Sequence, residues 1–268
     1  MGIESNAIQF LCAAKNYGVE FDDVLMFGRQ TFFPTAPALA RVFQALDVKE
    51  DPVSFHERTR FAEPFFELLG AKRVRSLDYS DFEGAEVIHD MNQPLPAEMR
   101  NQAGVVFDGG SIEHVFHVSQ ALKNLMELVR VGGWFMQITP ANNFMGHGFW
   151  QLCPEVAYRA FTPENGFERP IVFVKEWSRE NGWYAAKEPA KIGRRVELQN
   201  VDMTQVFTMA RKTADVEVFK TPPLESDYQA LWEEAHEQKG IPEKAVDDGK
   251  QKVVEKPSRP ASQARALW

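Results

Sequence analysis

The stretch GVVFDGGSIEHVFHVSQALKNLMELVRVGGWFMQITP, residues 104–140, decides the fold of this chain. It opens with a short apolar run at 105–107 that stops at Asp108 and Gly109. An apolar, β-branched run that ends at glycine is typical of a strand buried on both faces of a parallel sheet.

The second half of the same stretch predicts a helix and another strand. Ser119 stands in the N-cap position, and apolar residues then recur at helical spacing. Gly132 and Gly133 are expected to end this helix, and residues 134–138 begin the next strand. Strand, helix and strand in this order predict a parallel βαβ unit. Because ligands of open parallel sheets bind beyond the carboxyl ends of the strands, residues 108–113 are expected to line a site.

Length and composition predict a soluble globular protein with one substantial α/β core. The chain has 268 residues, of which 44% are hydrophobic and 25% charged. A net charge of −8 disfavours nucleic acid as a partner, because phosphate binding needs clustered Lys and Arg. No apolar run is long enough to span a membrane, so no membrane partner is expected. Cys12 and Cys153 lie far apart without metal-site spacing, which favours a reducing, cytoplasmic location.

Taken in order, the chain alternates short apolar strands with helices. Strands are expected at 24–27, 73–77, 86–89, 105–107 and 134–139, and helices at 4–17, 38–46, 61–69 and 227–238. Two longer strands, 171–177 and 201–212, have no helix between them, which predicts an antiparallel pair at the edge of the sheet. The pattern therefore predicts an α/β fold in residues 1–221, and residues 222–268 are expected to form a C-terminal helix with a charged, flexible tail.

Acidic residues follow three of the predicted parallel strands, where their side chains would meet in one crevice. Asp78 follows the second strand, Asp90 the third and Asp108 the fourth, while Gly28 follows the first. Carboxylates there can accept hydrogen bonds from ribose hydroxyls or an adenine amino group, and a glycine lets the backbone approach a ligand. The alternative, a solvated turn or N-cap residue, is the better interpretation for any one acid alone. Together they favour a cofactor that contains a nucleoside.

The order of these motifs resembles that of the class I S-adenosylmethionine-dependent methyltransferases, over about residues 23–211. The segment DGGSIEHV, the helix after it, the VRVGG turn and the following strand match best. The resemblance implies a seven-stranded Rossmann-like sheet with helices on both faces, S-adenosylmethionine as cofactor, and methyl transfer with release of S-adenosylhomocysteine.

The resemblance also implies roles for the residues that follow the strands. Asp78 would hold the ribose, and Tyr79 would stack on the adenine. The adenine would be bordered by Asp90 and Met91, and the methionine end of the cofactor would lie beside Asp108 and Gly109.

The turn after the first strand departs from the pattern of this family, which usually carries several glycines there. Here Gly28, Arg29 and Gln30 supply a single glycine. Arg29 could compensate by binding the cofactor carboxylate bidentately, or it could be a surface residue. The missing glycines also count against a nicotinamide cofactor, whose pyrophosphate needs a glycine-rich turn.

Two histidines are candidates for a catalytic base on the substrate side, because an imidazole titrates in the range needed to remove a hydroxyl proton. His147 lies in PANNFMGHGFWQLCPE, directly beyond the fifth strand, where loops bring substrates to the cofactor. The alternative for His147 is a capped turn. His114 follows Glu113, and this pair is equally explained by a structural polar contact at the start of the helix.

Side chains near His147 are predicted to bind the acceptor, and they are Asn142, Asn143, Trp150 and Gln151. Amides beside a histidine favour O-methylation of a small-molecule or carbohydrate-like acceptor. The alternative is a non-catalytic protein of the methyltransferase fold that binds a nucleoside or a protein partner.

No metal site is expected from the sequence. Asp90, Asp108 and His114 could converge at the sheet edge, but carboxylates that border a nucleoside already explain two of the three.

Overall fold

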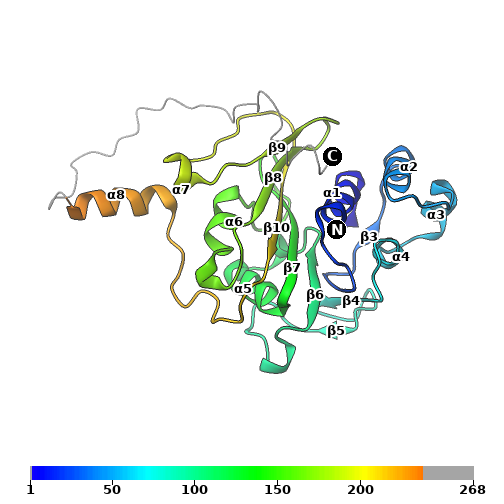
Figure 1. Cartoon of the computed structure of the whole chain (residues 1–268), viewed down its shortest axis with the longest axis horizontal. Helices are drawn as coiled ribbons and strands as arrows, with labels where there is room; N and C mark the ends of the chain where they lie inside the picture. Colours follow the sequence, from blue (N-terminus) through cyan, green and yellow to red (C-terminus); the bar gives the residue numbers. More distant parts are fainter. Residues whose placement is uncertain (1, 238–268) are drawn as a thin grey trace.

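The computed structural model describes residues 2–237, and the predicted tail lies outside this range. An eight-stranded sheet forms the centre of the described part (Figure 1). In spatial order its strands are β5 (Val87–Ile88), β4 (Arg73–Asp78), β2 (Asp23–Phe27), β6 (Ala103–Asp108), β7 (Val129–Pro140), β10 (Thr204–Arg211), β8 (Ile171–Glu176) and β9 (Trp183–Ala185).

The pairing of these strands confirms the predicted α/β fold with a mostly parallel sheet. Strands β5, β4, β2, β6 and β7 are parallel to their neighbours, whereas β10 is antiparallel to β7 and β8. The predicted antiparallel pair, β8 and β10, is therefore present, but it does not form the edge. Strand β10 has a neighbour on both sides and is buried along most of its length, and the additional strand β9 lies beyond β8, so the sheet has eight strands where seven were expected.

The strand order reverses between β2 and β6. The chain passes from β2 to β4 and β5 on one side of the sheet, and then returns to β6 on the other side. Phe27 at the end of β2 is paired with Asp108 at the end of β6. In open α/β sheets, ligands bind in the crevice outside the carboxyl ends of the strands at such a reversal. The topology therefore predicts a ligand site beside the turns that follow β2 and β6.

Alternate residues of the central strands build two cores, one on each face of the sheet. Val24 and Met26 pack in a core with α1 (Ser5–Tyr17), α2 (Ala36–Ala45), α3 (Pro52–Arg58) and α4 (Glu63–Leu68). Leu25 and Phe27 face the opposite core with α5 (Val118–Leu128) and α6 (Pro154–Ala160). Figure 1 shows the two helical layers on either side of the strands. This alternation is what a strand with period two requires when both of its faces are covered.

The N-terminal helices are extended by features that the sequence pattern did not predict. α3 separates α2 from α4, so three helices lie between β2 and β4 where two were expected. The short strands β1 (Gly2–Ile3) and β3 (Thr31–Phe32) pair in a small parallel sheet of their own. They tie the turn after β2 to the start of the chain.

Two local predictions around α5 are wrong. Ser119 lies inside the helix, because α5 begins at Val118 with His117 at its N-cap. Gly132 and Gly133 lie within β7, since α5 ends at Leu128 and β7 follows at once. The two glycines lie where the pairing of β6 with β7 shifts register, between the pairs Ala103–Val129 and Val105–Trp134. Gly132 has a φ of 85°, as a residue at a β-bulge often does.

The C-terminal part of the described chain carries two more helices, α7 (Pro189–Ile192) and α8 (Ser226–Glu237). α8 confirms the helix predicted at 227–238. In the range 2–237, no helix has the length and hydropathy needed to cross a bilayer.

Candidate functional site

The carboxyl ends of β4 and β5 present the residues that were expected to hold a nucleoside. Asp78 is half-buried at the end of β4, and its Oδ1 accepts a hydrogen bond from the Tyr79 backbone N–H at 2.7 Å. Its Oδ2 accepts no hydrogen bond from the described residues, so it is available to a ligand. The ring of Tyr79 is 72% exposed. A free carboxylate oxygen followed by an exposed aromatic ring fits a ribose and a base.

Asp90 and Met91 follow β5. Oδ1 of Asp90 accepts the backbone N–H and the side-chain amide of Asn92, at 3.0 and 2.8 Å. The hydrogen bond from the Asn92 backbone is the main reason that the pKa of Asp90 lies below its ordinary value. Met91 is buried, and its carbonyl accepts a hydrogen bond from Asn124 on α5. Asp90 is therefore held as an ionised turn residue at the edge of the crevice.

Asp108 is fully buried, and both of its carboxylate oxygens are already bonded within the protein. Oδ1 accepts the Ser111 backbone N–H at 2.7 Å, and Oδ2 accepts the Gln137 side-chain amide at 2.9 Å. Burial raises the pKa of Asp108 to about 6, against the opposing effect of these hydrogen bonds. Asp108 thus fixes the turn after β6 rather than offering a free oxygen to a ligand.

Gln30 fills the space between the turns after β2 and β6. Its side chain is fully buried, and its amide nitrogen donates to the carbonyls of Phe27 and Gly28 at 2.7 and 3.1 Å. Its Oε1 is buried and accepts no hydrogen bond within the described part of the chain. The Gln30 amide lies against Gly109, where an added Cβ would come 2.5 Å from Oε1. The smallness of Gly109 is therefore explained by Gln30, and an unpartnered acceptor lies at the strand-order reversal.

Arg29 is placed differently from the expectation that it binds a cofactor carboxylate. Its guanidinium pairs with Glu63 at 2.7 Å and donates to the Glu83 carbonyl at 2.8 Å. It also stacks over Phe61, 4.1 Å from the ring centroid. The charge of Arg29 is therefore paired by a carboxylate of the protein, and this arrangement favours the alternative of a structural residue.

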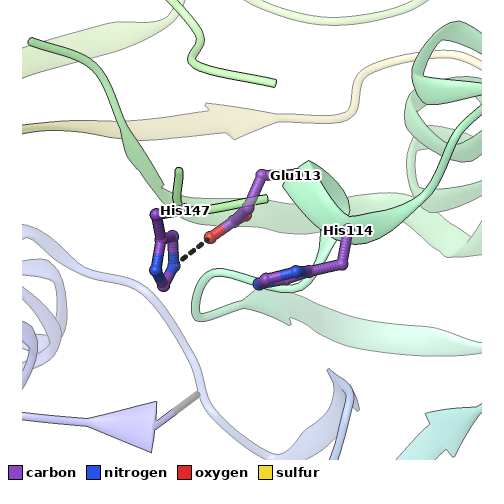
Figure 2. Close-up of side chains that lie close together, drawn as sticks. All are labelled: Glu113, His114 and His147. Carbon is purple, nitrogen blue, oxygen red and sulfur yellow. Dashed lines mark ion pairs between the residues drawn. The ribbon is translucent and has the colours of Figure 1, made fainter. Parts of the chain in front are cut away.

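Glu113, His114 and His147 converge beyond the end of β6 (Figure 2). Glu113 and His114 belong to the short helical turn η2 (Ile112–His114), and His147 comes from the loop after β7. His147 Nε2 lies 3.5 Å from Glu113 Oε1, and the two imidazole centroids are 5.2 Å apart. The structure thus brings together the two histidines that the sequence proposed separately.

Gly148 lets the loop after β7 reach η2. It has a φ of 72°, and an added Cβ would come 2.8 Å from the Glu113 carbonyl oxygen. The Phe149 backbone N–H donates to that same oxygen at 2.7 Å. This close backbone contact positions His147 beside Glu113.

Burial dominates the electrostatics of this cluster. Only 1% of Glu113 is exposed, and burial followed by the nearby Asp108 charge raises the pKa of Glu113 to about 8. Burial and the neighbouring His147 lower the pKa of His114. The side chain of His147 is 47% exposed, so the cluster is open to solvent on the imidazole side.

The amides predicted to bind an acceptor are bonded within the protein. Asn142 donates to the Leu198 carbonyl, and Asn143 donates to the Asp202 carbonyl at 2.7 Å. Gln151 donates to the His147 carbonyl at 2.9 Å. These three amides hold the loop that carries His147, which the spacing of residues along the sequence could not show.

Exposed aromatic residues belong to the two segments that carry the cluster. Phe116 and Phe149 are 62% and 63% exposed, and their rings are in edge-to-face contact. Trp150 is 38% exposed, and its indole N–H donates to the Val115 carbonyl at 3.1 Å. These three residues form an exposed aromatic wall between the segment after η2 and the loop after β7, which suits a small acceptor.

Two cavities lie elsewhere on the described chain. One of about 610 Å³ lies along α5 and α6 under residues 222–225, and one of about 370 Å³ lies between α7 and α8. Neither is lined by residues 28–30, 78–79, 90–91 or 108–114. The turns at the strand-order reversal, in contrast, carry the unpartnered oxygens of Gln30 and Glu113, and His114 and His147 lie beyond them.

No protein-family model matches this sequence, and no curated protein matches it. Solved structures are similar at low identity. They include the trans-methyltransferase CalH in complex with SAH, at 13% identity and a TM-score of 0.41 over 78% of this chain and 57% of that one. TehB from Haemophilus influenzae has 13% identity and a TM-score of 0.40, over 75% and 61% of the two chains. YcgJ from Bacillus subtilis has 10% identity and a TM-score of 0.38, over 76% and 99%. Similarity this low does not assign a function, so the function is inferred from the residues of this chain.

The roles of two residues of the site were not predicted from the sequence. Glu113 was expected to line the site as the last residue of 108–113, but not to contact His147. Gln30 was considered only as part of a departure from a glycine-rich turn, and no sequence signal marks it. Their burial depends on tertiary contacts that no sequence pattern specifies.

Proposed function

We propose that this chain is an S-adenosylmethionine-dependent methyltransferase that methylates a hydroxyl of a small-molecule or carbohydrate-like acceptor. The observation that carries the proposal is the free Oδ2 of Asp78 at the end of β4, followed by the exposed ring of Tyr79. Asp78 lies one strand away from the reversal of strand order, where open α/β sheets bind nucleotides.

The residues of the crevice fit both ends of this cofactor. Asp78 would accept hydrogen bonds from the ribose hydroxyls, while Tyr79 would stack on the adenine and Asp90 and Met91 would border it. At the methionine end, the unpartnered Oε1 of Gln30 would accept a hydrogen bond from the amino group.

The turns at the methionine end have supporting roles. Gly28 has a φ of 69°, and it keeps the turn after β2 free of a side chain. Asp108 and Gly109 shape the turn after β6, and Arg29 supports the crevice through Glu63.

When bound, the cofactor supplies a methyl group on a sulfonium, so that the acceptor oxygen bonds to the methyl carbon while the carbon–sulfur bond breaks and its electron pair stays on sulfur. The acceptor must also lose its hydroxyl proton. His147 and His114 are the candidates for handling that proton, because both are exposed beside the crevice and Glu113 positions His147. Phe116, Phe149 and Trp150 would exclude water from the acceptor.

The side-chain amides of the loop after β7 would affect the acceptor indirectly, because they fix the conformation of that loop. Asn142, Asn143 and Gln151 fix the backbone around His147, and they would orient it for the acceptor.

A non-catalytic ligand-binding protein is the second candidate, and one observation favours it. The side chain of Gln30 fills the turn after β2, and Arg29 of the same turn is paired with Glu63. The backbone N–H groups of this turn are therefore less accessible to a cofactor than those of a glycine-rich turn.

The two candidates differ in product formation. The purified chain is incubated with S-adenosylmethionine and a panel of sugars and small alcohols, and S-adenosylhomocysteine is quantified. We expect its release to depend on at least one acceptor. Cofactor binding without release across the panel would favour the non-catalytic protein.

A further inference from the structure

Glu113, His114 and His147 offer three metal-ligand atoms that lie within 4.8 Å of one another. The set consists of one carboxylate and two imidazoles, which is a donor set of catalytic sites for transition-metal ions. Such sites leave further coordination positions open for water or a substrate. Here the carboxylate is buried and the two imidazoles are exposed, so the open positions would face solvent.

The buried carboxylate provides a second, independent observation. Glu113 Oε2 is buried and has no hydrogen-bond partner in the described part of the chain. A buried carboxylate oxygen without a partner is costly, since burial removes its hydration and nothing replaces it. A cation bound in the cluster by both oxygens of the Glu113 carboxylate would supply the missing interaction.

The distances suit a tetrahedral ion. With metal–ligand bonds of about 2.1 Å, two ligand atoms of a tetrahedral site lie about 3.4 Å apart. His147 Nε2 and Glu113 Oε1 are 3.5 Å apart. An imidazole centroid lies about 3.2 Å from a bound metal, so two tetrahedral imidazoles have centroids about 5.2 Å apart. The centroids of His114 and His147 are 5.2 Å apart.

We propose that Glu113, His114 and His147 bind a divalent transition-metal ion, with Zn²⁺ as the reference ion. Two imidazole nitrogens favour Zn²⁺, Fe²⁺ or Ni²⁺ over Mg²⁺ and Ca²⁺, which prefer oxygen ligands. The proposal departs from the expectation that the chain holds no metal, which considered Asp90 and Asp108 as partners of His114. The ligand atoms that converge with His114 come from Glu113 and His147 instead.

The consequence for catalysis rests on the proposed methyl transfer, whereas the binding of the ion does not. A cation at this position would lower the pKa of an acceptor hydroxyl beside it, so that its proton passes to solvent as the oxygen attacks the methyl carbon. The two histidines would then act on the acceptor through the ion. The ion would also hold the acceptor oxygen at the end of β6, next to the cofactor crevice.

Calorimetric titration of chelator-treated protein with ZnCl₂, in the absence of S-adenosylmethionine, tests the site directly. We expect one Zn²⁺ per chain, and no saturable binding of Mg²⁺ at the same concentrations. Glu113→Gln, His114→Ala and His147→Ala are each expected to weaken Zn²⁺ binding at least tenfold. Glu113→Gln keeps the side-chain volume, and His147 is half exposed, so these two variants are expected to fold.

His117→Ala is the matched control, since His117 is an exposed histidine three residues from His114 and outside the cluster. It should bind Zn²⁺ within about twofold of the unmodified chain. The proposal is overturned if the unmodified chain binds no stoichiometric Zn²⁺, or if the three site variants bind as tightly as His117→Ala. Titration of the same metal-free protein with S-adenosylmethionine separates the two proposals. If the unmodified chain binds S-adenosylmethionine but not Zn²⁺, the metal site is refuted. If it binds Zn²⁺ but not S-adenosylmethionine, the methyltransferase proposal is refuted and the metal site stands.

Discussion

Gly109→Ala tests whether Gln30 shapes the binding crevice. An added Cβ would come 2.5 Å from Gln30 Oε1 and 2.9 Å from Gln30 Cδ, so the Gln30 side chain would have to move. That side chain is anchored by hydrogen bonds to the Phe27 and Gly28 carbonyls and to the Ser111 hydroxyl. Overpacking of a buried position costs about 1–3 kcal/mol, and each hydrogen bond lost adds about 1 kcal/mol. We expect Gly109→Ala to lower the free energy of unfolding by about 2–4 kcal/mol.

A double-mutant cycle with Gln30→Ala isolates this contact. In the Gln30→Ala background the two Gln30 atoms are absent, but Phe107 Cε1 remains close, at 2.9 Å from the added Cβ. Gly109→Ala should then still cost about 1 kcal/mol, which leaves a coupling energy of at least about 1 kcal/mol. Unfolding in urea measures the midpoint of each variant, and an unchanged m-value shows that the change is one of stability.

Gly132→Ala is the control, because an added Cβ there meets nothing within 4 Å. Its cost comes from its positive φ alone and should be the same in both backgrounds. Equal costs of Gly109→Ala in the two backgrounds would refute the role given to Gln30, and would return Gly109 to the ligand-facing role expected from the sequence.

Three further predictions concern the acceptor side, the cofactor turn and the N-terminal helix. His147→Ala should lower turnover by about a hundredfold or more while cofactor affinity stays within about threefold, and unchanged turnover per folded molecule would remove His147 from the mechanism. Arg29→Ala should leave S-adenosylmethionine affinity within about threefold, because Glu63 pairs its charge, and a tenfold loss in calorimetry would show that Arg29 binds the cofactor. Burial raises the pKa of Glu4 above its ordinary value of 4.5, so its ionisation disfavours the folded state. The stability that the protonated Glu4 contributes is present below pH 4.5, and it is lost as the pH rises through the raised pKa of Glu4 in the folded state. Urea unfolding across this range should show a smaller loss of stability for Glu4→Gln than for the unmodified chain, and parallel curves would contradict the assignment.

The central strands were predicted from the sequence because their burial on both faces leaves continuous apolar runs. β2, β6 and the second half of β7 fall on such runs, whereas β4 carries two arginines and is buried only near its end, and Asp78 and Asp108 mark the ends of β4 and β6. The short strand β5 also falls on a predicted range, which was too long by one residue at each end. The strand order was not predicted from the sequence, because the position of β10 between β7 and β8 depends on strand pairing and not on composition.

The sequence named candidate residues at the ends of the strands, but it did not show their contacts. His114 and His147 were both named as candidates, yet their contact across 33 residues of chain depends on the loop geometry at Gly148. Asn142 and Asn143 are polar and lie near the cluster, as expected, but their amides bond to the segment around Asn200. A sequence shows which groups can donate or accept, and only the fold shows which of them are already paired.

Binding of S-adenosylmethionine to the unmodified chain and to Asp78→Ala, measured by isothermal titration calorimetry, tests the central claim most directly. The exposed Asp81, three residues along, provides a matched control as Asp81→Ala. The unmodified chain should bind one molecule, and Asp78→Ala should bind it about ten- to a hundredfold more weakly, since charge-assisted hydrogen bonds of this kind contribute about 1.5–3 kcal/mol. Asp81→Ala should bind as the unmodified chain does. No binding by the unmodified chain, or equal affinity in all three proteins, would contradict a cofactor site built on Asp78.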